Sequence, residues 1–110
     1  MIPLNFIGGT VTHDDLSLLR DDAVAKQTEL LKEDMLQVEF AGGLLLDVGW
    51  YPEFDASGDF RINVVKNHDW CRPVITLTAH ETAELIEQLN IAQNAINGEL
   101  RNTTLGTSAV

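Results

Sequence analysis

The chain has 110 residues, 45% of them apolar, and its seventeen acidic and seven basic side chains give a formal net charge of −10. This length and composition favour one globular domain with a single core, and they exclude a disordered chain. The negative charge disfavours nucleic acids and anionic membranes as partners and favours a basic protein surface. The same charge is also compatible with a role in solubility alone.

Three features of the sequence favour a cytoplasmic protein. The first seven residues carry no positive charge and no small-residue cleavage site, so we expect no signal peptide. The longest apolar run, residues 41–46, is too short to span a bilayer. Cys71 is the single cysteine and cannot form an internal disulfide, which fits a reducing compartment.

The first third of the chain predicts a helix. Residues 1–7 alternate in polarity and are compatible with a short strand. Thr12 can then cap a helix whose positive end suits Asp14 and Asp15. A broken apolar stripe continues to about Glu33 through Leu16, Leu19, Ala23, Leu30 and Leu31. We therefore expect an N-terminal helix over residues 13–33.

The centre of the chain predicts an antiparallel sheet. Four segments alternate apolar and polar residues, as strands with one buried face do. They are Leu36–Phe40, Leu44–Trp50, Phe60–Val64 and Ile75–Leu77. Residues 41–43 have the glycines of a tight hairpin loop. The pattern favours a meander of four or five strands, with Trp50 in the core.

A helix that covers the sheet is predicted after the last strand. Thr78 and Glu81 have the spacing of a capping box. An apolar helical face follows, formed by Leu85, Ile86, Leu89, Ala92, Gln93 and Ile96. Gly98 is expected to end the helix. We thus predict one α+β domain over residues 1–101 and a flexible tail over residues 102–110.

The residues that could carry catalysis or hold a metal have simpler structural explanations. Acidic residues that open a helix account for the carboxylates near His13 and His80, and the second histidine of a zinc helix is absent. His68, Asp69 and Cys71 share one loop but lack the geometry of an activated nucleophile. We expect no metal, no cofactor and no enzymatic activity.

Acidic and aromatic residues in the connections after the second and third predicted strands favour protein binding. Tyrosine and tryptophan are preferred anchors of protein interfaces, and carboxylates pair with basic partner residues. The predicted partner-binding residues are Asp47, Tyr51, Glu53, Asp55, Asp59, Asp69 and Trp70. A shared end of the sheet would bring the two connections together.

Residues 46–70 contain Asp-Val-Gly-Trp-Tyr-Pro-Glu, an acidic glycine-containing turn, a strand that begins with phenylalanine, and Asp-Trp before a proline. In this order of motifs the segment resembles immunity-type proteins of contact-dependent or polymorphic toxin systems. It implies a bacterial protein that neutralises a cationic toxin or nuclease by occluding its active site. Two alternatives remain open: a phage-borne inhibitor of a host nuclease or CRISPR complex, and a non-catalytic structural or oligomerisation module. A homodimer also remains open.

Overall fold

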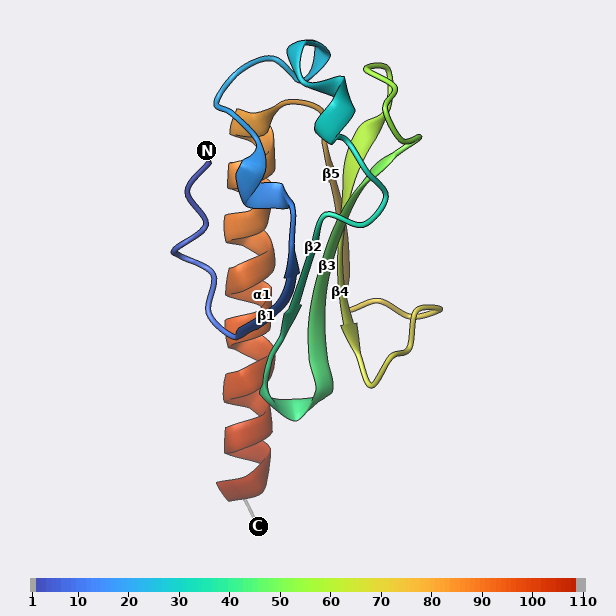
Figure 1. Ribbon diagram of the computed structural model, residues 1–110. Helices are drawn as coiled ribbons and strands as arrows, with labels where there is room; N and C mark the ends of the chain where they lie inside the picture. The colour runs from blue at the N-terminus through green and yellow to red at the C-terminus, as the bar shows by residue number, and fades with distance from the viewer. Residues whose placement is uncertain (1, 109–110) are drawn as a thin grey trace.

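Five antiparallel strands lie in chain order in the computed structural model, which describes the backbone of residues 2–108 and the side chains of residues 2–102. The strands are β1 (Thr10–Asp14), β2 (Leu36–Glu39), β3 (Leu44–Tyr51), β4 (Asp59–Lys66) and β5 (Ile75–Ala79). Helix α1 (Thr82–Ser108) runs along one face of the sheet, as Figure 1 shows. The predicted α+β class, with an antiparallel sheet and a C-terminal helix, is confirmed.

The two central strands supply most of the core. β3 and β4 pair over their whole length, and the register sets Val48 opposite Ile62 and Trp50 opposite Phe60. All four side chains are fully buried. The rings of Trp50 and Phe60 meet edge to face with their centroids 4.7 Å apart, a favoured geometry for aromatic pairs. The placement of Trp50 in the core is therefore confirmed.

The core face of the sheet has two covers. Helix α1 packs on β4 and β5 and buries Leu85, Leu89, Ala92 and Ile96. Side chains from the N-terminal third complete the core, namely Ile2, Leu16, Leu19, Val24 and Leu31. Both covers are joined where Gln93 on α1 accepts a hydrogen bond from the backbone N–H of Gly8.

The N-terminal helix predicted over residues 13–33 is wrong. Strand β1 occupies the start of this stretch, and three 3₁₀ turns follow at Leu16–Leu18, Val24–Lys26 and Thr28–Leu30. The fully buried side chain of Gln27 explains the irregular path, because it accepts from the N–H of Arg20 and donates to the carbonyls of Arg20 and Asp22. These bonds satisfy a looped backbone that a helix would have satisfied internally. The short strand expected over residues 1–7 is wrong as well, because residues 2–7, the described part of this segment, contain no strand.

The two ends predicted for the C-terminal helix are also wrong. Thr78 lies in β5 opposite Arg61, so it caps nothing. Glu84 instead accepts from the backbone N–H of His80 at 2.6 Å, just before the first turn of α1. The helix passes Gly98 and continues to Ser108. Its backbone therefore includes most of residues 102–110, and the flexibility of that segment stays a prediction.

The hairpin connections alternate between the two ends of the sheet. Residues 41–43 join β2 to β3 with Gly42 at φ 74° and Gly43 at φ 77°, which confirms the predicted hairpin. The β3–β4 connection, residues 52–58, lies at the opposite end, and the β4–β5 connection, residues 67–74, returns to the first end (Figure 1). This alternation decides which predicted site residues can meet.

Candidate protein-binding face

The face of the sheet that points away from α1 has no helical cover. We call it the open face. Strand alternation and the register assign to it Gln37, Glu39, Leu45, Asp47, Gly49, Tyr51, Asp59, Arg61, Asn63, Val65, Thr76 and Thr78. In contrast to the apolar core face, most of these side chains are polar or charged. The open face is therefore the largest polar surface that the sheet presents.

A transverse row of polar side chains crosses the middle of the open face. Gln37, Asp47, Asn63 and Thr76 lie directly opposite one another on β2 to β5. Gln37 donates to the carboxylate of Asp47 at 3.4 Å, and the hydroxyl of Thr76 donates to the side-chain oxygen of Asn63 at 2.9 Å. The bond from Gln37 orients the Asp47 carboxylate on the face, and the bond from Thr76 does the same for the Asn63 amide.

Two further carboxylates reach this face through a bulge before β2. Met35 donates its N–H to Val48 and Trp50 donates its N–H to Lys32, so residues 33–34 bulge opposite Gly49 alone. The Glu33 carbonyl lies so close to Gly49 that a Cβ there would overlap it. Glycine at this position thus lets the chain place Glu33 and Asp34 beside Asp47 and Tyr51.

The charges around Tyr51 are strongly unbalanced. Burial raises the pKa of Tyr51, and the carboxylates of Asp47, Glu33 and Asp34 raise it further, while Arg61 lowers it. The Arg61 guanidinium stacks 5.0 Å from the centre of the Tyr51 ring and also pairs with Asp59 at 3.5 Å. We call Glu33, Asp34, Asp47, Tyr51, Asp59 and Arg61 the Tyr51 cluster.

The central carboxylate of this cluster is held in an unfavourable environment. Burial raises the pKa of Asp47 and the nearby Asp34 adds to the effect, while the hydrogen bond from Gln37 opposes it. A carboxylate with a raised pKa in the folded state destabilises that state once it is ionised. Ionised Asp47 therefore lowers the free energy of unfolding of this protein.

The β3–β4 connection holds two predicted residues in structural roles. Glu53 accepts a hydrogen bond from the backbone N–H of Glu33 at 3.2 Å and so supports the bulge. Asp55 accepts from the hydroxyl and the N–H of Ser57, and these bonds lower the pKa of Asp55. Its backbone carbonyl accepts from the Trp50 indole at 2.8 Å. Glu53 and Asp55 thus shape the rim beside the Tyr51 cluster.

The remaining two predicted residues, Asp69 and Trp70, do not join this cluster. They lie in residues 67–74, at the other end of the eight-residue strand β4, which spans roughly 25 Å. The expectation that the two aromatic connections lie at the same end of the sheet is therefore wrong, because successive turns of a meander alternate between the two ends of the sheet. Residues 67–74 nevertheless project on the side of the sheet away from α1 (Figure 1), and Trp70 is 49% exposed.

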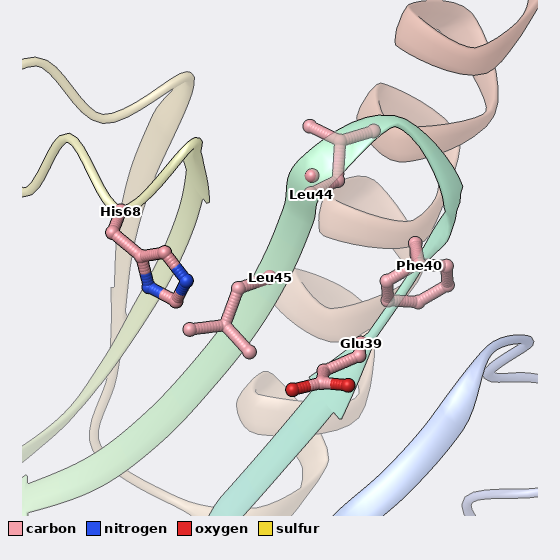
Figure 2. Close-up of a pocket in the computed structure, with 6 residues that line it drawn as sticks. Glu39, Phe40, Leu44, Leu45 and His68 are labelled. Atoms are coloured by element: carbon pink, nitrogen blue, oxygen red, sulfur yellow. The ribbon is translucent and has the colours of Figure 1, made fainter.

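A shallow hollow lies beside this second connection. Figure 2 shows His68 pointing toward Leu45, with Glu39 and Phe40 on the neighbouring strand end. The hollow has a volume of about 150 Å³, well below the range of small-molecule sites. Its single histidine and single carboxylate form no catalytic constellation. It is suited at most to one side chain of a docked protein.

The histidines near carboxylates make local bonds. His13 Nε2 lies 3.3 Å from Asp15 and 3.1 Å from the Asp34 carbonyl. His80 Nδ1 contacts the Gly58 carbonyl at 2.9 Å. Within residues 2–108, no three histidine, cysteine or acidic side chains gather closely enough to hold a metal ion. The absence of a cofactor and of enzymatic activity stays a prediction.

Asp47→Asn should stabilise the protein at pH 7, because the folded state then no longer holds an ionised carboxylate whose pKa is raised. The advantage should shrink as the pH falls through the raised pKa of Asp47 and should be gone below about 4, where the unfolded aspartate is protonated as well. Urea unfolding at both pH values measures the difference. Tyr51 is the single tyrosine, so ultraviolet titration should also show its pKa falling in the variant. A variant less stable than the wild type at pH 7 would contradict the proposed environment.

The sequence prediction missed Glu33, Asp34, Arg61 and Asn63. Polar and apolar residues alternate along β4, so the sequence could have assigned Arg61 and Asn63 to the face that points away from the core. The bulge that carries Glu33 and Asp34 left no comparable pattern.

Comparison with known proteins adds no relative: no family model, no curated protein and no solved structure matches this chain. In the described part of the chain, no helix has both the length and the apolar character needed to cross a membrane.

Proposed function

We propose that this protein is an immunity-type inhibitor that binds a basic protein, a toxin or nuclease, and covers its active site with the open face. The observation that carries the proposal is the Tyr51 cluster, in which several carboxylates surround one half-buried aromatic ring. Tyrosine is a frequent anchor in interfaces, and the carboxylates around it complement lysine and arginine.

The chemistry of the cluster fits a nuclease as the partner. An enzyme that binds nucleic acid lines its active site with basic residues that contact phosphates. Carboxylates can pair with the same residues and thereby exclude the substrate. Asp47 lies on β3, and Glu33 and Asp34 lie in the bulge that is hydrogen-bonded to β3 on both sides, so a preorganised backbone presents the three charges together and lowers the entropic cost of binding. Arg61 pairs with Asp59, so among the described residues of the cluster Glu33, Asp34 and Asp47 are the carboxylates without a salt bridge.

The test is inhibition of the protein encoded by the adjacent gene, followed by binding kinetics at two salt concentrations. Association should slow as salt rises, because exposed charges are screened over ~8 Å at physiological ionic strength. Tyr51→Ala should weaken binding by ~2 kcal/mol or more through faster dissociation. Asp47→Asn should weaken binding although it stabilises the fold, which separates a binding role from a structural one.

Charge reversal on the two sides of the molecule provides a matched control. Asp59→Lys on the open face should slow association, whereas Glu87→Lys on the exposed side of α1 makes the same charge change and should not. Trp70→Ala shows whether the partner also reaches the far end of the open face. The proposal would be refuted if the protein does not inhibit, or if binding changes neither with salt concentration nor with Tyr51→Ala. Either result would favour a role of the negative charge in solubility. A phage-borne inhibitor would use the same surface, and gene neighbourhood separates the two.

A further inference from the structure

The two edges of the sheet differ in how they are protected. The β1 edge carries the charged or ionisable residues His13 and Asp14 and an irregular register between Val11 and His13. Charges and bulges of this kind prevent an edge from pairing with another strand. The β5 edge, Ile75–Ala79, has no charged residue, no proline and a continuous register with β4. It therefore presents a regular, uncharged row of backbone donors and acceptors.

Apolar side chains next to the β5 edge are incompletely covered. Ile75 and Leu77 belong to the core face but are only half-buried. On α1, the flank with Ile86 and Gln93 faces the N-terminal segment, since Ile86 lines a hollow with Ile2 and Gln93 binds Gly8. Successive residues of an α-helix lie 100° apart around its axis, so the opposite flank of α1 carries Gln88, Ile91 and Ala95. This opposite flank faces the β5 edge of the sheet.

This second flank of α1 is itself incomplete. Ile91 is 46% exposed, which is unusual for a large aliphatic residue beside an open sheet edge. The side-chain oxygen of Gln88 is buried without a hydrogen-bond partner among the described residues. An edge strand and a helix flank that lie side by side thus both lack a partner.

We propose that a second copy of this chain pairs with β5, antiparallel and centred on Leu77, to form a continuous ten-stranded sheet. This register sets Leu77 opposite Leu77, Ile75 opposite Ala79 and Thr76 opposite Thr78. Every core-face residue then meets a core-face residue, and both open-face pairs are Thr–Thr pairs, which are favourable across strands. The two α1 helices lie on the same side, with Ile91 of each flank at the joint.

The charges favour a second copy over a basic peptide at this edge. β5 carries no carboxylate, and the open-face residue of β4 opposite Thr78 is Arg61, which pairs with Asp59, so a basic strand gains no acidic partner from this edge. Each copy has a net charge of −10, but the five paired residues are uncharged. The strand pairing therefore sets no acidic side chain of one copy opposite an acidic side chain of the other. The Tyr51 cluster lies on β3, β4 and the bulge before β2 and includes no residue of β5, so this dimer does not depend on the proposed inhibitor function.

Sedimentation velocity over a concentration series tests the dimer with two β5 variants. The wild type should sediment at twice the 12.1 kDa of one chain. Thr76→Lys with Thr78→Lys sets lysine opposite lysine twice and should weaken the dimer at least tenfold. Thr76→Glu with Thr78→Lys sets glutamate opposite lysine twice and should restore it. Both variants lose the bond from Thr76 to Asn63 and share the Thr78→Lys change opposite Arg61, so they differ only at position 76.

Two further variants control for charge and for the helix flank. Thr10→Lys with Thr12→Lys adds the same two charges to the exposed β1 edge and should leave the dimer intact. Ile91→Glu should weaken the dimer tenfold or more while circular dichroism stays unchanged. A monomeric wild type, or equal dimer affinities for the two β5 variants, would overturn the proposal. A dimer without salt-dependent partner binding would support this inference and still refute the inhibitor function.

Discussion

Leu89→Asp should unfold the protein, with a loss of about 4 kcal/mol or more in the free energy of unfolding. Leu89 is fully buried on α1, which packs against β4 and β5. An aspartate there would bury a charge without a partner or force its protonation, and either outcome removes much of the stability of a small domain. Leu85→Asp, at another fully buried position of the same helix, should have a similar effect.

Urea unfolding followed by circular dichroism measures this loss, with Glu87→Lys as the control. Glu87 is exposed, and its reversal should change the unfolding free energy by less than about 0.5 kcal/mol. Glu84 is not a suitable control, because its carboxylate accepts from His80 before α1 begins, and its loss should cost about 1 kcal/mol. Equal unfolding midpoints for Leu89→Asp and Glu87→Lys would show that α1 does not cover the sheet.

Gly49→Ala should be the most damaging single-methyl change, with an expected loss of about 3 kcal/mol. The added Cβ would overlap the Glu33 carbonyl, a backbone atom that cannot rotate away. The bulge over residues 33–34 must then move, which displaces two carboxylates of the Tyr51 cluster. Under the proposed function, partner binding should weaken together with stability, because the same contact positions the bulge and its two carboxylates.

Gly98→Ala makes the same chemical change where space is open. No atom outside the local helix lies within 4 Å of a Cβ at this position. Alanine there should stabilise α1 by about 0.5–1 kcal/mol, since glycine is a poor residue inside a helix. Urea unfolding of both variants provides the comparison. If Gly98→Ala destabilises the protein, the helix does not continue past residue 98; if Gly49→Ala is neutral, the bulge does not lie over β3.

The predicted sheet and much of the site followed from local pattern. Alternation along β3 and β4 assigned Trp50, Phe60 and Ile62 to the core, and the structure confirms their burial. The same alternation assigns Asp47 and Tyr51 to one face, where the register sets Tyr51 opposite Asp59. This success has a physical reason, because a strand of period two that is buried on one face records its orientation in every second residue.

The sequence by itself thus determined the α+β class, the order of the central strands and the residues of α1 that face the core. Only the tertiary structure decided the path of residues 13–33, because the bonds of buried Gln27 join backbone groups that no periodicity reveals. It also separated Trp70 from Tyr51 and brought residues 33–34 over Gly49. These contacts depend on how distant segments approach one another, and local preference carries no information about that approach.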